Sequence, residues 1–402
     1  MKQVYIIDYI RTPIAKFQGG LSEVRADDLA AIVLKEIVKR NPQIPAEEIE
    51  DVILGCANQA GEDNRNVARM ASLLAELPIK IGGETVNRLC ASGMAAIANA
   101  YRAIAIGEGD FYIAGGVEQM TRAPYVLSKS AQPFGRDVQL FDSSFGWRFV
   151  NPKMKELYGV DGMGETAENL AEIYKISREA QDEFALHSQQ KATSAQNSGR
   201  LAQEIVNVEV PQKKGEPKIF SEDEFVKPDT TLDKLAKLRP AFKKEGGSVT
   251  AGNSSGLNDG AAAMILASED AVKKYNLKPL AKIISSAVVG VEPRIMGIGP
   301  VEATKKALSR ANLSLEDMDI IELNEAFAAQ ALSVLQELGI DAKDERLNPN
   351  GGAIALGHPL GMSGTRIVGT AALELQKKNK KYALCTLCIG VGQGYAMIIE
   401  KI

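Results

Sequence analysis

The chain contains two histidines, so an imidazole base has two possible positions. His358 lies in the segment GGAIALGHPLGMSG, and glycine-rich loops of this kind bring backbone and side chains close to ligands. His187 lies among Gln, Asp, Glu and Lys residues of an expected amphipathic helix over 177–196, where a solvated surface position explains it. We therefore expect His358 to be the base if the protein uses an imidazole.

Cys90 is the first candidate nucleophile. It directly precedes the run ASGMAAIANAYRAIAIG, which predicts a helix, and the free N–H groups at a helix start favour a thiolate. The alternative is a buried structural cysteine, the usual role of a lone thiol. The position at the helix start favours the nucleophile, with Ser92 available as a cap and Gly93 allowing close backbone approach.

Cys388, in the turn CIGVGQG, is a candidate second thiol, whereas Cys56 and Cys385 are expected in the core. The pair Cys385-x-x-Cys388 could be half of a zinc site or a redox pair. Zinc would need two further ligands, and redox pairs of this spacing open a helix, whereas YALCTLCIG alternates like a strand. The glycines that follow lead into the strand YAMIIE, so they form no dinucleotide-binding loop. We expect neither a metal nor a nicotinamide cofactor.

Asn324 ends an apolar strand and enters a helix in the segment LNEAFAAQ. One interpretation is a helix cap, a common position for asparagine. The other is a fixed amide that holds a water molecule or an oxyanion. The residues by themselves leave both interpretations open.

The elements that must position these residues occur twice along the chain. The segment 86–116 predicts a turn, a helix and a strand, and the segment 350–390 predicts the same order, with Ser92-Gly93 matching Ser363-Gly364. Two copies of a long repeat indicate a duplicated domain rather than a solenoid. Apolar runs alternate with helical stretches, which is typical of α/β folds. The helices over 91–107 and 363–375 are small and apolar nearly all round, so we expect them to be buried between sheets.

A more highly charged segment, 122–250, separates the two halves. We expect three units: an N-terminal domain over 1–121 plus 251–275, an inserted loop domain over 122–250, and a C-terminal domain over 276–402. The length of 402 residues fits two or three domains at roughly 150 residues each.

Composition excludes several classes of function. The 47 Lys and Arg against 51 Asp and Glu give a net charge of −4, which disfavours sequence-independent nucleic-acid binding. No window holds eighteen uninterrupted apolar residues, so we expect no membrane span. The start, MKQVYIIDYIRTP, lacks a signal-peptide pattern, and we expect a cytoplasmic protein.

Four separate motifs together resemble the thiolase family: Cys90 before a helix, N-E-A-F at 324–327, G-H-P at 357–359 and C-x-G at 388–390. The resemblance extends from RTP at 11–13 to GVGQG at 390–394, essentially the whole chain. The segments 59–70, 145–163 and 348–361 look especially like the bacterial branch that acts on 3-oxoadipyl-CoA and other 3-oxoacyl-CoA esters. The resemblance implies the thiolase fold, with duplicated αβαβα layered domains and an inserted loop domain.

The resemblance also implies a ping-pong acyl transfer to coenzyme A. His358 would take the proton of Cys90, whose thiolate attacks the 3-keto carbon of a 3-oxoacyl-CoA. Cys388 would protonate the departing acetyl-CoA carbanion, and His358 with a water held by Asn324 would stabilise the enolate oxygen. The backbone N–H groups of Cys90 and Gly390 would form a second oxyanion hole. Coenzyme A is then a substrate, and no resident cofactor is implied.

By family position, the inserted domain would bind coenzyme A. The resemblance places Ser255 and Phe242 on the pantetheine arm, Met163 and Phe327 in the pocket, and Lys227 near the adenine. From residue 227 to 244 there are six basic residues against two acidic ones, a local charge of +4, which a phosphate-rich ligand would use. The family implies a homodimer or homotetramer.

One departure concerns the substrate. Biosynthetic acetoacetyl-CoA thiolases carry a histidine just before the Met-Gly of this pocket, whereas this chain has Asp161-Gly162-Met163-Gly164. We therefore expect a degradative role, with acetoacetyl-CoA formation as the alternative. A 3-oxoacyl synthase is disfavoured because its decarboxylating forms use two catalytic histidines, and only His358 is available here. A non-catalytic CoA or lipid carrier is disfavoured by the presence of all four catalytic residues.

The segment 141–164 leads into Met163 and is expected to cover the acyl pocket. It carries Trp147 and Arg148, with Lys153 and Lys155 nearby. A desolvated carboxylate needs a cationic partner, so these residues predict a dicarboxylic acyl group such as that of 3-oxoadipyl-CoA. The alternative is that these cations pair with Glu156, Asp161 or solvent.

Overall fold

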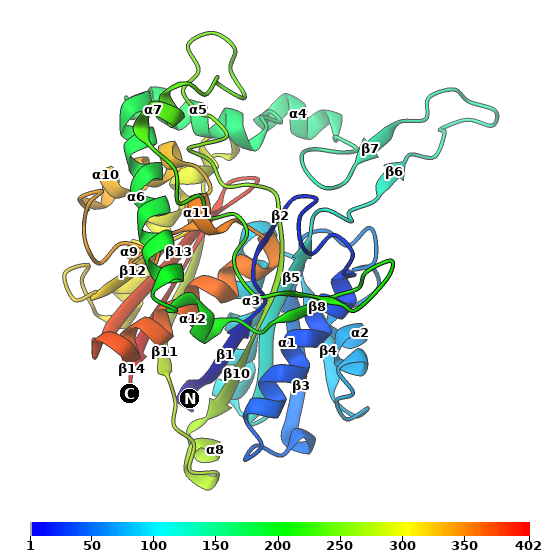
Figure 1. Ribbon diagram of the computed structural model, residues 1–402, viewed down its shortest axis with the longest axis vertical. Coiled ribbons are helices and arrows are strands. Elements are labelled where there is room, and N and C mark those ends of the chain that lie inside the picture. The colour runs from blue at the N-terminus through cyan, green and yellow to red at the C-terminus, as the bar shows by residue number, and fades with distance from the viewer. Residues whose placement is uncertain (1) are drawn as a thin grey trace.

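The computed structural model describes residues 2–402 and shows one mixed sheet covered by helices (Figure 1). Its strands follow the order β12-β13-β14-β11-β1-β10-β5-β3-β4, with the short β2 paired to β10. The strands of the first half are β1 (Val4–Arg11), β2 (Ala15–Lys16), β3 (Ile49–Gly55), β4 (Gly82–Val86), β5 (Phe111–Gln119) and β10 (Asn258–Ser268). Those of the second half are β11 (Ala281–Gly290), β12 (Ile320–Leu323), β13 (Tyr382–Ile389) and β14 (Gln393–Lys401).

The predicted duplication is confirmed by the strand order. The first half runs β1-β10-β5-β3, and the second runs β11-β14-β13-β12, the same arrangement of first, last, third and second strand. The corresponding pairs β3 with β5 and β12 with β13 are parallel, and β5 and β13 each pair antiparallel with their other neighbour, β10 and β14. In the first half β3 also pairs parallel with the edge strand β4. The halves join where β1 pairs with β11, at Tyr5 opposite Lys282 and Ile6 opposite Ala281.

The helices form layers around this sheet. The central layer contains α3 (Ser92–Ile106) and α12 (Leu360–Lys378), which contact each other and strands of both halves. The outer helices of the first half are α1 (Ala26–Arg40), α2 (Val67–Leu74) and α8 (Glu269–Lys274). Those of the second half are α9 (Gly299–Ala311), α10 (Ala328–Leu338) and α11 (Ala353–Leu356). One large buried apolar cluster surrounds the central helices, and two others lie under the outer helices of the first and second halves, in agreement with the αβαβα order that the resemblance implied.

The close crossing of α3 and α12 depends on glycine. A Cβ on Gly93 would lie 2.5 Å from Thr365 Oγ1 and 2.7 Å from the Gly361 carbonyl oxygen. A Cβ on Gly364 would lie 2.3 Å from the Met94 backbone nitrogen. All three distances are too short for a Cβ contact. Because glycine has no side chain, Gly93 and Gly364 let the two helix starts meet at the centre of the molecule.

Much of the segment between the halves lies over one end of the sheet, drawn in cyan to green in Figure 1, while residues 208–220 pack against the first half. It contains β6 (Tyr125–Leu127), β7 (Leu140–Asp142), α4 (Pro152–Tyr158), α5 (Met163–Ile173), α6 (Arg178–Asn197), β8 (Val208–Val210), β9 (Lys218–Phe220) and α7 (Leu232–Ala236). Ser177 caps α6 by accepting the Ala180 N–H, as its position predicted. The chain then returns to the first half as β10, between β1 and β5.

A buried ionic network fastens this segment to the core. Arg11 of β1 donates to Glu204 at 2.7 Å and to Asp223 at 2.7 Å, and Arg200 donates to Glu374 of α12 at 2.9 Å. All five side chains are nearly inaccessible to water. Removing one partner from such a network leaves an unpaired buried charge and typically costs about 3–5 kcal/mol.

Helix α3 with the turn before it, Leu89–Ile106, is long and apolar enough to cross a membrane by length and composition alone. Two thirds of this stretch, 67%, is buried inside the fold. Its apolar character is therefore explained by its position in the central layer.

Candidate active site

A cavity of about 270 Å³ lies where the inserted segment covers the ends of the central helices. It is largely apolar, and it brings together Cys90, His358 and Cys388 from three distant parts of the chain. The other side chains and backbone atoms that line it are Met120, Phe145, Met163, Phe242, Ser255, Gly256, Leu257, Met296, Ala326, Phe327 and Leu360. A concave apolar site with a few convergent reactive groups is the usual form of an enzyme active site.

Cys90 lies in a short 3₁₀ turn, Leu89–Ala91, directly before α3. Ser92 holds this turn closed: its hydroxyl donates to the Leu89 carbonyl at 2.7 Å and accepts the Arg88 N–H at 2.8 Å. Leu89 has a positive φ of 46°, which is rare for a branched residue and strains the backbone next to the thiol. The turn therefore fixes the thiol at one place on the cavity wall.

Burial raises the pKa of Cys90 to about 11, and the N–H groups of Gly390 and of Cys90 itself oppose this rise. The expected influence of free backbone N–H groups is therefore present. Loss of solvent nevertheless outweighs these donors in the free protein. Cys90 rests as a thiol and needs a base.

His358 lies in the loop between α11 and α12, and its ring is held from one side. Nδ1 lies 2.7 Å from the Ser363 hydroxyl oxygen, and the same hydroxyl donates to the Pro359 carbonyl at 2.8 Å. Because the single hydroxyl proton is committed to Pro359, Ser363 accepts from Nδ1–H. Nε2 is then unprotonated and available as a base. The backbone N–H of His358 donates to Asn258 Oδ1 at 2.9 Å.

The pKa of His358 is lowered to about 3, first by burial and second by the positive charge of Arg366. Arg366 is itself buried and donates to Glu322 at 3.0 Å. The imidazole is therefore neutral at working pH, which is the form that can accept a thiol proton. The resting pair is a neutral thiol and a neutral imidazole.

Cys388 is the penultimate residue of β13 and is fully buried. The hairpin that follows contains Val391 with a φ of 63° and Gly392 with a φ of 86°. Burial and the neighbouring Cys90 raise the pKa of Cys388 far above its usual value. A protonated thiol at this place can donate a proton to a carbanion. Cys56 and Cys385 are buried elsewhere, and all four cysteines are free.

Asn324 follows β12 but does not cap a helix, because α10 begins four residues later at Ala328 with Phe327 at its cap position. Its Nδ2 instead lies 3.4 Å from His358 Nε2, and its buried Oδ1 has no hydrogen-bond partner among residues 2–402. An unpartnered buried amide oxygen beside an imidazole ring can hold a water molecule. Between the two interpretations left open by the sequence, the geometry favours the fixed amide.

The expected binding residues Ser255, Phe242, Met163 and Phe327 all line the cavity. Phe242 and Phe327 meet edge to face with ring centroids 6.1 Å apart, and Ser255 donates to the Ala326 carbonyl at 3.0 Å. Apart from the Ser255 hydroxyl, these side chains give this part of the cavity an apolar wall.

Lys227 lies outside this cavity. Its ammonium group lies 4.8 Å from the centroid of the Phe225 ring, and the residue lines a second, more open hollow of about 560 Å³ between α6 and residues 227–230. His187 is half-buried on α6 and lines neither cavity.

The segment 141–164 reaches the cavity with two residues, Phe145 and Met163. The Trp147 indole N–H donates to the Asp161 carbonyl at 3.3 Å, and the Asp161 carboxylate pairs with Arg294 at 3.0 Å. Arg148 is partly buried, and within the described residues it has no carboxylate partner, only the Ser143 carbonyl at 3.3 Å. Asp161 is therefore not the partner of Arg148.

Sequence reasoning missed Ser363 as the partner of His358, although its place five residues downstream in the first turn of a helix was a usable signal. It also missed Met120, Met296 and Leu360 in the cavity wall, which come from elements remote in the chain. One further group, Cys56, Asp63 and Glu118, has ligand-type atoms within 4.8 Å of one another outside the cavity.

Two family models match the chain: "Thiolase, N-terminal domain" over residues 4–270 and "Thiolase, C-terminal domain" over residues 277–401. The chain is 59% identical over 402 residues to a protein of Escherichia coli strain K12 named 3-oxoadipyl-CoA/3-oxo-5,6-dehydrosuberyl-CoA thiolase, with 100% of both chains covered. It is 58% identical over 402 residues to a beta-ketoadipyl-CoA thiolase of Acinetobacter baylyi, again with 100% of both covered.

Solved structures agree with this similarity. The acetyl-CoA acetyltransferase of Bacillus anthracis superposes with a TM-score of 0.93 at 42% identity, covering 100% of this chain and 99% of the other. Human mitochondrial 3-ketoacyl-CoA thiolase in complex with CoA superposes with a TM-score of 0.91 at 42% identity, covering 100% and 98%.

Proposed function

The chain belongs to the thiolase family, and from that premise we propose that Cys90, His358, Cys388 and Asn324 cleave a 3-oxoacyl-CoA with coenzyme A. The observation that carries the proposal is the single buried cavity lined by both thiols and the imidazole. Coenzyme A is a substrate in this reaction and not a resident cofactor.

In the acylation half, His358 Nε2 takes the proton of Cys90 as the thiolate adds to the 3-keto carbon. The backbone N–H groups of Cys90 and Gly390 receive the developing oxyanion. Both N–H groups already lie close enough to the sulfur to lower its pKa, which supports this role. The C2–C3 bond then breaks and leaves an acyl group on Cys90.

The electron pair of the broken bond remains on C2 of the departing acetyl-CoA as an enolate. His358 and a water molecule on Asn324 stabilise the enolate oxygen, and Cys388 gives its thiol proton to C2. The absence of ionised groups from the cavity wall makes these donors more effective, because their interactions are not screened by water.

In the second half, coenzyme A enters, loses its thiol proton to Cys388, and takes the acyl group from Cys90, whose departing thiolate recovers its proton from the His358 imidazolium. We propose that the segment 122–250 binds coenzyme A, with its Phe242 and the nearby Ser255 of the N-terminal domain along the pantetheine arm. Lys227 lines the open hollow outside the cavity, and the basic run over 227–244 to which it belongs suits the phosphate groups. The three-unit division given above is part of this proposal.

For the acyl group, we propose 3-oxoadipyl-CoA, which would be cleaved to acetyl-CoA and a four-carbon dicarboxylic acyl-CoA. Two observations support this substrate: the names of the relatives at 58–59% identity, and Arg148 beside the cavity segment without a carboxylate partner. A buried substrate carboxylate requires such a cation. The role is therefore degradative.

Acetoacetyl-CoA formation is the second candidate, favoured by the superposition on the acetyl-CoA acetyltransferase of Bacillus anthracis. A thiolysis assay separates the two by following the loss of 3-oxoacyl-CoA absorbance on addition of coenzyme A. We expect kcat/KM for 3-oxoadipyl-CoA to exceed that for acetoacetyl-CoA at least tenfold, about 1.4 kcal/mol. Equal values would favour a general 3-oxoacyl-CoA thiolase. A complete lack of thiolysis would contradict the proposal.

We further propose that the enzyme is a cytoplasmic homodimer or homotetramer. The hairpin of β6 and β7 projects from the rest of the chain, as Figure 1 shows, and exposes Tyr125, Leu127, Phe134 and Leu140. Exposed apolar side chains concentrated on one projection are typical of subunit contacts. Light scattering on the purified protein tests the number of subunits.

A further inference from the structure

Glu118, at the end of β5, is 1% exposed, and no cation within the described residues pairs with it. Its carboxylate accepts three backbone N–H groups: Ala57 at 3.0 Å, Asn58 at 2.9 Å and Gly361 at 2.8 Å. The first two belong to the loop after β3, and the third belongs to α12. One side chain thus joins two segments separated by 300 residues of sequence.

Gly361 lies in the first turn of α12, three residues after His358. The cap position of this helix is Pro359, which has no side-chain group to accept an N–H. Glu118, on the neighbouring strand β5, instead accepts the Gly361 N–H at this helix start. A carboxylate also interacts favourably with the positive end of a helix. A Cβ on Gly361 would lie 2.2 Å from the Val117 carbonyl oxygen, so the helix start rests directly on β5.

The location of Glu118 has a counterpart in the repeat. Gly116 of β5 is opposite Gly55 of β3, and Thr386 of β13 is opposite Leu323 of β12. Two residues after these positions lie Glu118 in the first half and Cys388 in the second. The first half therefore places a hydrogen-bonding carboxylate where the second places a reactive thiol.

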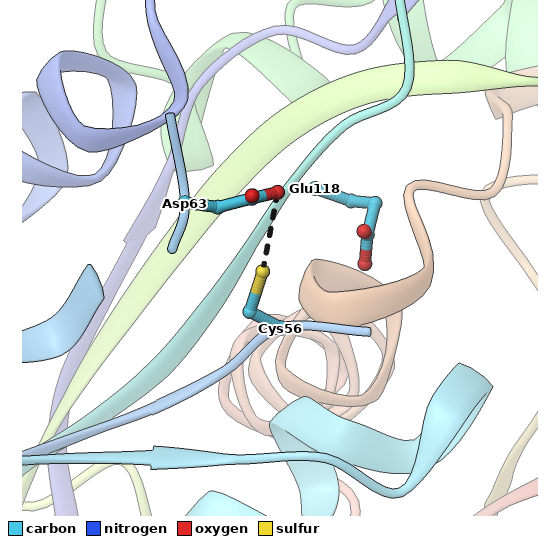
Figure 2. Close-up of side chains that lie close together, drawn as sticks. All are labelled: Cys56, Asp63 and Glu118. Carbon is cyan, nitrogen blue, oxygen red and sulfur yellow. Dashed lines mark hydrogen bonds between the residues drawn. The ribbon is translucent and has the colours of Figure 1, made fainter. Parts of the chain in front are cut away.

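Ligand-type atoms of Cys56 and Asp63 lie within 4.8 Å of the Glu118 carboxylate. In Figure 2 the dashed line joins the Cys56 thiol to the Asp63 carboxylate, and none joins either residue to Glu118. Oε2 of Glu118 accepts from both Ala57 and Gly361, which occupies both of its lone pairs. Asp63 accepts the Gly61 N–H at 3.0 Å, and the Cys56 thiol donates to the Asn58 carbonyl at 2.8 Å. These groups are engaged in holding the loop.

We propose that Glu118 is a positioning residue for His358. By fixing the Gly361 N–H, it sets the first turn of α12, in which the Pro359 carbonyl and the Ser363 hydroxyl hold the imidazole through Nδ1. Nε2 is thereby aimed into the cavity. The proposal rests on the proposed role of His358 as the base.

The substitution Glu118→Gln tests this, because the amide keeps the volume but turns an N–H₂ group towards backbone donors. We expect kcat of thiolysis to fall at least tenfold while KM for coenzyme A stays within twofold, since the binding surface is untouched. Asp63→Asn is the matched control: it removes a buried carboxylate of the same cluster that makes no bond to α12, and we expect wild-type kcat.

A second readout reports the ring directly. The chain has two histidines, so nuclear magnetic resonance of ¹⁵N-histidine-labelled protein gives one ring to observe and His187 as internal reference. In Glu118→Gln we expect faster solvent exchange of the His358 Nδ1–H and unchanged His187 signals. Glu118→Asp, which keeps the charge but shortens the reach, takes its place if the glutamine variant does not fold, and should show a smaller loss.

If the wild type is active and the Glu118 variant keeps both the wild-type His358 signal and the wild-type kcat, the positioning role is overturned. An equal loss in Asp63→Asn would also overturn it, because the effect would then be one of general stability. An inactive wild-type enzyme would instead contradict the proposed function, so the two failures are distinguishable.

Discussion

Ser363 Oγ lies 2.7 Å from His358 Nδ1, and this bond sets which ring nitrogen carries the proton. The hydroxyl donates to the Pro359 carbonyl and so can only accept from the ring. In the proposed reaction Nε2 takes the proton of Cys90, which would make the ring cationic and strengthen the bond from Nδ1–H.

We expect Ser363→Ala to lower kcat about 10- to 100-fold with a small change in KM. A hydrogen bond to a charged group is worth about 1.5–3 kcal/mol, which corresponds to that range. Steady-state thiolysis measures it. Thr365→Val is the matched control, because the Thr365 hydroxyl on the same helix is buried without a partner. Wild-type kcat in Ser363→Ala would show that the ring is held by other contacts.

The two cysteines of the cavity are expected to have separable roles. Cys388→Ala should still take an acetyl group from acetyl-CoA on Cys90, visible by peptide mass mapping, because His358 remains as the base. It should lose exchange of the C2 protons of acetyl-CoA with deuterium at least 100-fold, about 2.7 kcal/mol, because the proton donor is gone.

The control for this experiment is Cys385→Ala, a buried thiol of the same strand that does not line the cavity. It should keep both activities. Acetylation of Cys385 or Cys56 in place of Cys90, or undiminished exchange in Cys388→Ala, would contradict the assignment.

The lowered pKa of His358 predicts a loss of stability in acid. As the pH falls below about 6.5, the ordinary value, the unfolded chain takes up a proton on this ring. The folded protein does not do so until a pH of about 3. The unfolded state therefore binds more protons between these values, and the ring contributes up to about 1.4 kcal/mol of destabilisation per pH unit.

Urea denaturation of wild type and His358→Gln between pH 8 and pH 5 measures this contribution. The stability of the variant should fall less steeply below pH 6.5 than that of the wild type, with the difference between the two curves constant above pH 7.5. Parallel curves over the whole range would show that the ring titrates normally in the folded protein.

Arg148 predicts a selective effect on substrate. In Arg148→Ala we expect kcat/KM for 3-oxoadipyl-CoA to fall about tenfold or more, about 1–3 kcal/mol, because a charged hydrogen bond is lost. The uncharged 3-oxohexanoyl-CoA should be cleaved as by the wild type. Lys153→Ala, which removes an exposed cation of the same segment, is the control. An equal change for both substrates would remove Arg148 as the selector.

The duplicated α/β organisation could be predicted from the sequence, because it depends on local patterns. Apolar runs mark the strands, and small residues around Gly93 and Gly364 mark the helices that must cross closely. His358 and Cys90 could also be singled out, since rare reactive residue types stood at the starts of helices and in glycine-rich loops.

Protonation and pairing were decided only by the tertiary structure. The resting thiol of Cys90 follows from burial on all sides, which no local pattern measures. Asn324 meets His358 instead of capping α10, and Glu118 caps a helix that begins more than 240 residues away. Desolvation and hydrogen bonding depend on which atoms are neighbours in space, and these neighbours come from both halves of the chain.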